Sequence, residues 1–379
     1  MSQRLSPALI AILVVLVGLG FNDQAGSAQL ATRGTPPTVL ACGGTPASSA
    51  SSDEQQSMPT MPTSGQNDAA SITLQTVADI PLAGSASRFD YQSFDPSSGR
   101  LYIAHMGASE LDVFDTPSQT VVGTVTDLPT VTGVLVVPNL KRVYAAVAGS
   151  HEVTVIDTDT LAVIGRLGEI GFPDGLDFAP DQQRVFVSDE SGGGELVIDA
   201  LTNTVVTTVD LGGEAGNTHY DMGSGCILVA VQTRNELVAI DPDRLAIVGR
   251  YDMGTECQGP HGFLVDAPAR RAYVTCEDNA TMQVVDLMTM QVVDSLPTDD
   301  GPDVLALDPD WHRLYVAAES GAVSIFDVRG GTTRSAGAYQ FTHAHSISVD
   351  PATHLLYLPL EDVDGQPVLR IMESTPPGS

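Results

Sequence analysis

A short sequence phrase recurs seven times along most of this chain. Each copy contains an apolar strand, a turn that often includes Asp-Pro, a second apolar strand, a short turn and a third apolar strand ending in Asp. The copies begin at Asp90, Thr132, Asp174, Gly216, His261, Asp303 and His345, at intervals of 42, 42, 42, 45, 42 and 42 residues. A repeat of roughly 40–45 residues with several strands is typical of a β-propeller blade. We therefore predict an all-β, seven-bladed β-propeller with about 42 residues per blade.

The two ends of the repeat array predict how the ring closes. The seventh copy, from His345 to Met372, contains three expected strands and no fourth. Residues 72–82, with the sequence ITLQTVADIPL, resemble a fourth strand that has no blade before it. We expect this N-terminal strand to complete the last blade, because closure removes an open strand edge. The propeller is thus predicted to span residues 72–373, with a C-terminal tail at 374–379.

The first 71 residues differ from the repeats. Ala8 to Gly20 form an uninterrupted apolar run, and Gly26-Ser27-Ala28 offers a small-x-small cleavage site. We interpret residues 1–28 as a signal peptide and residues 29–71, rich in Ser, Thr, Pro and Gly, as a disordered linker. The protein is therefore expected to be extracytoplasmic, either periplasmic or secreted. The sequence VLACGG around Cys42 resembles a lipobox, which makes this cysteine a candidate membrane tether, although about 20 residues separate it from the apolar run.

The charge of the chain excludes one class of partner. There are 47 acidic residues against 17 basic ones, for a formal net charge of −30. Binding to phosphate backbones depends on clustered Lys and Arg, so we expect no nucleic-acid partner. The acidic excess has two interpretations. It can serve the general solubility of an exported protein, or it can attract cations to one part of the surface.

The remaining cysteines are placed by the repeat. Cys226 begins an expected strand at the end far from the entry position of its blade. Cys257 and Cys276 are expected on one face of the fifth blade. In an oxidising compartment this pair can form a disulfide; otherwise both are small free residues. No two cysteines have the Cys-x-x-Cys spacing of a metal site.

The repeats resemble those of the YVTN-repeat β-propeller family, which are typically exported bacterial proteins with seven blades. The resemblance rests on VYAAVAGSHEVTVIDTDTLAVIGRL (143–167) and VFVSDESGGGELVIDALTNTVVTTVDLGG (185–213), and it covers about residues 72–373. It implies a member of the WD40/YVTN-like superfamily. Related propellers include quinoprotein amine dehydrogenase β-chain-like proteins, gluconolactonase-like metal-dependent lactonases and haem d1 propellers. The resemblance implies no single activity, because the family is mostly uncharacterised.

Two rings of residues are expected to meet on one face, because the first strand of a blade starts where the second strand ends. The first ring consists of the seven entry positions. The second ring lies 16 residues later in each copy and consists of Met106, Ala148, Glu190, Gln232, Glu277, Glu319 and Glu361, preceded by His105 and Asp189 in two blades. Acidic and imidazole side chains are enriched in both rings. The candidate ligand-binding residues are Asp90, His105, Asp174, Glu190, His261, Glu277, Asp303, Glu319, His345 and Glu361.

Four consecutive blades offer candidate metal ligands. Their entry residues alternate between imidazole and carboxylate, and they are His261, Asp303, His345 and Asp90. Such a mixture suits Zn, Mn, Fe or Cu, whereas carboxylates alone favour Ca or Mg. We expect His343 and His345 on the same side of an extended segment. Glu277 and Glu319 are candidate general bases or orienting partners of the ligands. The alternative is a solvated polar channel mouth without a ligand.

These observations leave two functional hypotheses. The first is an exported binding or scaffold protein, expected to be a monomer, that presents a polar channel mouth to a small ligand, a metal or a protein partner. The second is a metal-dependent hydrolase, lactonase-like, or an oxidoreductase that uses the same cluster. A divalent metal is the one candidate cofactor. The sequence contains no Gly-x-Ser-x-Gly, phosphate-loop or His-Glu-x-x-His motif and indicates no nucleophilic triad, so we favour the first hypothesis.

Overall fold

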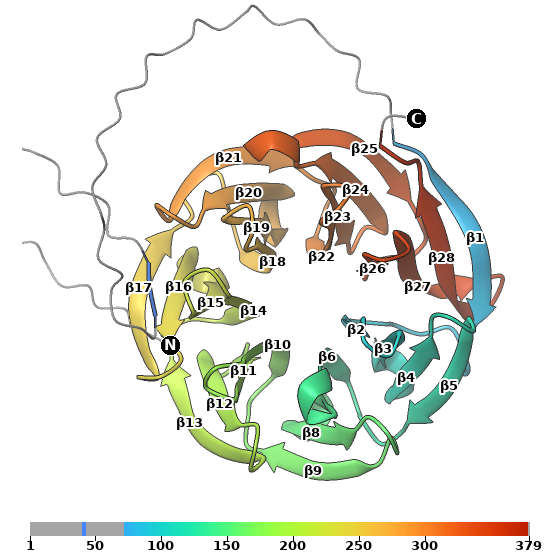
Figure 1. Cartoon of the computed structure of the whole chain (residues 1–379), viewed down its shortest axis with the longest axis horizontal. Helices are drawn as coiled ribbons and strands as arrows, with labels where there is room; N and C mark the ends of the chain where they lie inside the picture. Colours follow the sequence, from blue (N-terminus) through green and yellow to red (C-terminus); the bar gives the residue numbers. More distant parts are fainter. Residues whose placement is uncertain (1–39, 43–71, 378–379) are drawn as a thin grey trace, which may run out of the picture. The chain divides into compact units, whose positions relative to one another are not determined.

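Seven four-stranded antiparallel sheets surround a central axis in this computed structural model, which describes residues 40–42 and 72–377 (Figure 1). The predicted all-β, seven-bladed β-propeller is confirmed. In each blade the innermost strand lies beside the axis and the outermost strand lies at the rim (Figure 1). The predicted signal peptide and most of the predicted linker lie outside the described residues.

The first three blades follow the expected order of strands. Blade 1 contains β2 (Gln92–Asp95), β3 (Arg100–His105), β4 (Glu110–Asp115) and β5 (Thr120–Val125). Blade 2 contains β6 (Val131–Val137), β7 (Arg142–Val147), β8 (Glu152–Asp157) and β9 (Val163–Gly168). Blade 3 contains β10 (Pro173–Ala179), β11 (Arg184–Asp189), β12 (Gly194–Asp199) and β13 (Thr204–Asp210).

The next three blades repeat this pattern. Blade 4 contains β14 (Ala215–Asp221), β15 (Cys226–Val231), β16 (Glu236–Asp241) and β17 (Ala246–Asp252). Blade 5 contains β18 (Pro260–Asp266), β19 (Arg271–Cys276), β20 (Thr281–Asp286) and β21 (Gln291–Pro297). Blade 6 contains β22 (Pro302–Asp308), β23 (Arg313–Ala318), β24 (Ala322–Asp327) and β25 (Arg334–Gln340).

Short 3-10 turns connect some of these strands. They are η1 (Met106–Ala108), η2 (Pro138–Leu140), η3 (Ala148–Ser150), η4 (Gln232–Arg234), η5 (Glu277–Asn279) and η6 (Arg329–Gly331). Four of them, η1, η3, η4 and η5, directly follow the second strand of a blade and begin at the second-ring positions predicted from the sequence.

The seventh blade closes the ring as predicted. It combines β26 (Ser348–Asp350), β27 (Leu355–Val363) and β28 (Gln366–Ser374) with the N-terminal strand β1 (Leu74–Pro81), in the order β1-β28-β27-β26. The antiparallel register of β1 on β28 runs from Leu74 opposite Ser374 to Pro81 opposite Val368, with an irregularity after Thr76. Beyond the two strands, the Thr375 backbone N–H donates to Thr73 O at 2.9 Å.

The hydrophobic core is divided among the seven blade interfaces. Seven clusters of buried residues each combine side chains from two neighbouring blades, and the cluster between blades 7 and 1 includes Leu82, Phe89 and Tyr357. Because burial of apolar surface stabilises by about 25 cal/mol per Å², each interface depends on both of its blades. Loss of a strand from one blade is therefore expected to weaken the packing of the neighbouring blade as well.

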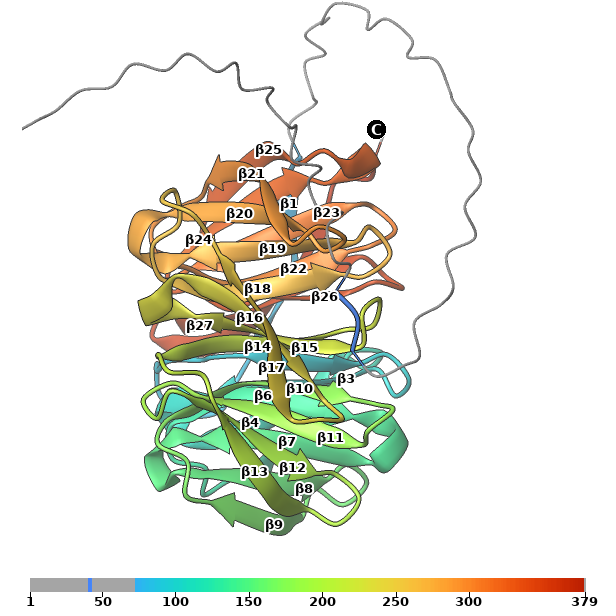
Figure 2. The ribbon, with the colours of Figure 1, turned by 90° about the vertical axis from the view of Figure 1, so that its left-hand side faces the viewer.

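A second type of contact joins neighbouring blades through arginines at the start of the second strand. Arg100 donates to Thr158 O at 2.6 Å in blade 2, and Arg142 and Arg184 make the equivalent contacts to blades 3 and 4. Blade 4 has Cys226 at this position. Cys226 instead forms a disulfide with Cys42, and the Cys42 backbone N–H donates to Ser224 O at 2.8 Å. The segment 40–42 thus lies against blade 4, where Leu40 joins the cluster between blades 4 and 5 (Figure 2).

This disulfide bears on the membrane tether predicted at Cys42. A lipid would be attached through the Cys42 sulfur, which the bond to Cys226 already uses. One molecule therefore carries either the disulfide or the lipid. The described residues contain no helix that is long and apolar enough to span a membrane. The two disulfides of the structure indicate an oxidising, extracytoplasmic compartment.

The second disulfide joins Cys257 and Cys276 within blade 5, which settles the choice left open by the sequence. It closes a short loop, because the two cysteines are 19 residues apart. A double Cys257→Ala, Cys276→Ala variant is expected to lose about 3 kcal/mol of unfolding free energy, as loops of this length typically give. Denaturant unfolding under oxidising conditions measures this loss. Under reducing conditions the variant and the wild type are expected to unfold alike; a difference that persists there would assign the effect to packing.

Candidate metal site at the channel mouth

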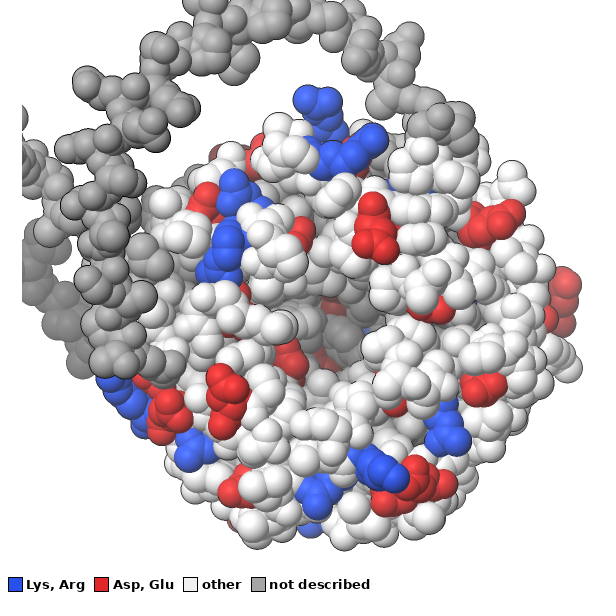
Figure 3. All heavy atoms as spheres, viewed as in Figure 1, with Lys and Arg blue, Asp and Glu red and all other residues white. Residues whose placement is uncertain are grey.

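The two predicted rings meet at one mouth of the central channel. Figure 3, which views the ring along its axis as Figure 1 does, shows the channel as a central hollow. A cavity of about 170 Å³ lies at this mouth. Its charged lining comprises six carboxylates, one arginine and one imidazole, from Arg88, Asp90, Asp174, Glu190, His261, Glu277, Asp303 and Glu319. This excess of negative charge at low exposure favours a cation, since charges taken out of water need a partner.

Glycines, which have no side chain, allow neighbouring inner strands to lie close together at this mouth. A Cβ on Gly133 would lie 1.9 Å from Asp174 O, and a Cβ on Gly262 would lie 1.7 Å from Asp303 O. Glycine is therefore required directly after the entry position in these blades. Blade 1 has Tyr91 at the same register, and this one large ring extends across the axis that the glycines leave open.

Tyr91 lines two cavities of the channel and hydrogen-bonds with side chains beside it. Its hydroxyl donates to Asp303 Oδ1 at 2.8 Å and accepts from Asn217 Nδ2 at 2.8 Å. Burial, and then the charges of Asp303, Asp174 and Asp90, raise the Tyr91 pKa well above its usual value, so the phenol keeps its proton. Tyr91 also lines a larger cavity of about 310 Å³ further along the channel, which His219 lines as well.

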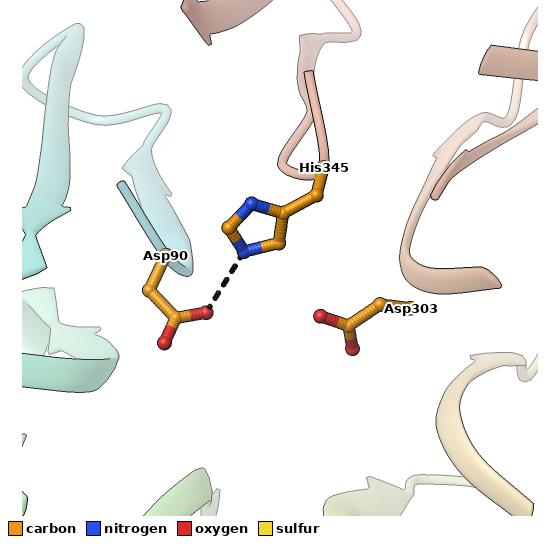
Figure 4. Close-up of side chains that lie close together, drawn as sticks. All are labelled: Asp90, Asp303 and His345. Carbon is orange, nitrogen blue, oxygen red and sulfur yellow. Dashed lines mark hydrogen bonds and ion pairs between the residues drawn. The ribbon is translucent and has the colours of Figure 1, made fainter. Parts of the chain in front are cut away.

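Three buried side chains converge on one point of the mouth (Figure 4). Asp90, Asp303 and His345 come from blades 1, 6 and 7, and each offers one ligand atom within 4.8 Å of the others. All three are at most 5% exposed. His345 Nε2 lies 3.4 Å from Asp90 Oδ1 and 3.3 Å from Arg88 Nη2. Tyr91 occupies only Oδ1 of Asp303, so the second carboxylate oxygen remains for a cation.

The structure places the predicted ligand His261 beside the three converging residues. Its Nε2 lies 3.4 Å from Asp303 Oδ1 and 3.8 Å from Asp174 Oδ2. Burial alone would lower its pKa, but the charges of Asp303, Asp174 and other carboxylates raise the pKa to about 9. The raised pKa favours the protonated imidazole in the metal-free site, so a metal bound by His261 would displace a proton. Protonated His261 balances charge beside the three converging residues, and Gln232 Nε2 lies 2.8 Å from its Nδ1.

Two carboxyl groups of the site, Asp174 and Asp303, have elevated proton affinity. Burial, and then the charge of Asp90, raise the pKa of Asp174 well above its usual value. Burial likewise raises the pKa of Asp303, although the nearby imidazoles oppose this effect. Crowded, buried carboxylates hold protons in the absence of a cation, and a divalent cation would displace them.

The two candidate bases differ in their environments. Glu319 accepts two hydrogen bonds from Arg88, at 3.2 and 2.6 Å. Burial would raise its pKa, but Arg88 outweighs this effect and lowers it. Glu277 lines the mouth without such a partner, and burial raises its pKa. Glu277 therefore suits proton transfer better than Glu319.

Three predicted positions lie away from the converging ligands. His105 is fully buried inside blade 1, where it contacts Asp112 instead of lining the mouth cavity. The expectation for His343 is wrong, because a turn with a φ of 58° at His343 interrupts the extended segment. The His343 side chain is 58% exposed and lies 3.7 Å from Glu361. This pair is absent from the lining of the mouth cavity among the described residues.

Sequence reasoning missed Tyr91 and Arg88. A signal for Tyr91 was present: aligning the seven copies places one large side chain in a column that otherwise holds Gly133, Gly175, Asn217, Gly262, Val304 and Ser346. Arg88 lies two residues before the first entry position, in a column of mixed residue types that otherwise holds Thr130, Phe172, Glu214, Gly259, Gly301 and His343. Its buried Nε has no acceptor among the described residues, although its Nη atoms bond Glu319.

Comparison with known proteins supports the fold and gives no family. No family model matches the sequence, and no curated protein matches it. A solved chain from "Kuenenia stuttgartiensis Hydrazine Synthase" aligns with a TM-score of 0.65 over 77% of this chain and 96% of that chain, at 17% identity. At this identity the similarity shows a shared propeller fold alone. Membership of the YVTN-repeat family stays a prediction.

Proposed function

We propose that this protein is a binding protein that holds one divalent metal ion at its channel mouth. Asp90, Asp303 and His345 would be its protein ligands. The observation that supports this most directly is the convergence of their three buried ligand atoms within 4.8 Å, in a mouth with six carboxylates. Two carboxylate oxygens and one imidazole nitrogen suit Zn²⁺ or Mn²⁺ better than Ca²⁺.

The negative charge of this mouth also favours a positively charged ligand. Glu190 and Glu277 add negative charge around the three ligands, whereas the one arginine is paired with Glu319. Water is largely excluded from the ligand atoms, so electrostatic attraction for a cation is stronger than at the surface. An ion held here would remain open to the channel mouth, where a small molecule or a protein partner could reach it.

Metal binding is tested by titrating the metal-free propeller with Zn²⁺ and Mn²⁺ and by measuring bound metal after dialysis. We expect one ion per chain. An Asp303→Asn, His345→Gln variant removes two of the three ligands at nearly constant volume, and it should weaken binding by at least about 100-fold. Bound metal should raise the melting temperature of the wild type and leave that of the variant unchanged.

The matched control is His343→Gln. It removes an imidazole two residues from His345, but this side chain is exposed and paired with Glu361. The control should bind metal as the wild type does. Absence of stoichiometric metal from the wild type, or equal binding by the double variant, would contradict the proposal and favour a solvated polar mouth.

The hydrolase hypothesis remains as a second candidate because of one observation. Glu277 lines the same cavity with a raised pKa, as a general base beside a metal-bound water requires. Lactone hydrolysis by the metal-loaded protein, lost in Glu277→Gln with metal content unchanged, would establish this activity.

A further inference from the structure

Three polar side chains of blade 1 form a hydrogen-bonded chain that is separate from the metal ligands. Ser87 Oγ lies 3.1 Å from His105 Nε2, and His105 Nδ1 lies 3.2 Å from Asp112 Oδ2. His105 and Asp112 are both fully buried, whereas Ser87 is partly exposed. An accessible hydroxyl, a buried imidazole and a buried carboxylate in this order have the geometry of a nucleophile, its base and the group that orients the base.

The surroundings determine which nitrogen of His105 carries the proton. With Nδ1–H donated to Asp112 Oδ2, the lone pair of Nε2 faces the Ser87 hydroxyl, which also donates to Ser85 O at 3.2 Å. Thr124 Oγ1 donates to the other carboxylate oxygen of Asp112 at 3.0 Å, which fixes the carboxylate. Phe89 stacks on the imidazole at 4.0 Å between ring centroids, which fixes its plane.

The propeller repeat does not require this chain of residues. At the register of His105 the other blades have Val147, Asp189, Val231, Cys276, Ala318 and Leu360. At the register of Asp112 they have Thr154, Leu196, Val238, Gln283, Ser324 and Arg370. Blades of the same fold therefore form without an imidazole–carboxylate pair at these positions. A buried His–Asp pair confined to one blade is more typical of a functional site than of a folding requirement.

Gly107 packs closely against Ser87. A Cβ on Gly107 would lie 2.5 Å from Ser87 Cβ and 2.8 Å from the backbone nitrogen of Arg88, so glycine lets the loop approach the serine. The Arg88 N–H donates to no acceptor among the described residues. A backbone N–H on the residue after a nucleophile is the kind of donor that stabilises the developing oxyanion of an acyl-transfer reaction. The Arg88 side chain lines the channel mouth, so Ser87 directly precedes a residue of the mouth.

We propose that Ser87 is an activated nucleophile for acyl transfer from small esters, with His105 as its general base. Ser87 Oγ forms a bond to the ester carbonyl carbon as its proton passes to His105 Nε2. The bond to the leaving alcohol oxygen then breaks, and that oxygen takes the proton from Nε2. Water attacks the acyl-Ser87 in the same way, which releases the acid and restores the hydroxyl. Asp112 is a positioning residue that holds the imidazole.

The test is covalent labelling with a fluorophosphonate probe, in which Ser87 Oγ displaces fluoride from phosphorus. Intact mass and peptide mapping are expected to find one adduct, at Ser87. Ser87→Ala should remove it, and His105→Gln should slow labelling by about 10²–10⁴-fold, the usual contribution of a general base. Ser85→Ala is the matched control, because it removes an exposed hydroxyl from the same loop and should label as the wild type does.

Several further outcomes are decisive. Failure to label Ser87 in the folded wild type, or equal rates for His105→Gln and wild type, would overturn the proposal. If His105→Gln does not fold, the Ser87 rate is compared with that of Ser85 in the wild type, and equal rates would again overturn it. His105, Glu110 and Asp112 could also hold a cation, which would use Nδ1 and place the proton on Nε2. The chelated protein should therefore label at least as fast as the untreated one; loss of labelling on chelation would contradict the proposal.

Discussion

Deleting residues 72–82 is expected to abolish the folded monomer. The deletion removes β1 and exposes the backbone of β28 along the register from Ser374 to Val368. It also removes Ile72 and Leu82 from the clusters on either side of blade 7. An unpaired strand edge next to two incomplete hydrophobic interfaces favours association with other chains. Light scattering after size-exclusion chromatography should show oligomers or aggregates, and thermal unfolding should lose its cooperative transition.

The control for this deletion is Val77→Ser. Val77 is 46% exposed and lies at the irregularity between Thr76 and Ala78, so its side chain contributes little to the interface. This variant should remain a monomer with a melting temperature near that of the wild type. A deletion protein with unchanged melting would show that blade 7 is stable with three strands.

Arg270→Ala should give the next largest loss of stability. Arg270 of blade 5 donates to both carboxylate oxygens of Asp221 in blade 4, at 2.5 and 2.9 Å, and Asp221 is fully buried. A Cβ on Gly223 would lie 1.9 Å from Arg270 Nη1, so glycine makes room for the guanidinium. Breaking such a pair leaves a buried charge without compensation and is expected to cost about 3–5 kcal/mol of unfolding free energy.

The pH dependence of this loss identifies its cause. Burial alone would raise the pKa of Asp221, but hydrogen bonds from Arg270, Ser224 and the Gly223 backbone outweigh it and lower the pKa. A lowered pKa gives stability that is fully present above the usual pKa of about 3.9 and is lost as the pH falls through the folded value. Denaturant titrations of wild type and Arg270→Ala should therefore differ most near neutral pH and converge in acid.

A second variant distinguishes the stability lost through the unpaired buried charge from the stability lost through side-chain packing. Arg270→Ala combined with Asp221→Asn removes the unpaired charge, so it should recover part of the lost stability at neutral pH. Equal stability of the single and double variants would assign the loss to the aliphatic part of Arg270.

The repeat made the ring predictable, because strand alternation and turn residues occur in every blade. It also located the mouth, since the entry residues Asp90, Asp303 and His345 share one register and one end of their blades. The closing strand was predictable from a count: one strand was missing at the end and one was in excess at the start.

Contacts outside the repeat were not predictable. Cys42 and Cys226 are 184 residues apart, and neither position indicates the other in sequence. The contact of Ser87 with His105 depends on how a non-repeating loop returns to β3. The charge around His261 depends on which carboxylates lie nearest to its Nε2. Each of these depends on a distance between side chains, which periodicity does not specify.

The Cys42–Cys226 disulfide has a consequence for how the ring resists strand exchange between molecules. β1 lies between this covalent attachment on blade 4 and the start of blade 1 at Phe89, so it is held at both ends. If β1 separates from β28, both attachments keep it near its own ring, and rebinding is an intramolecular step at high effective concentration. Domain swapping requires the exchanged element to reach a second copy. The oxidised chain therefore favours its own closure, whereas reduction frees one end of the strand for a neighbour.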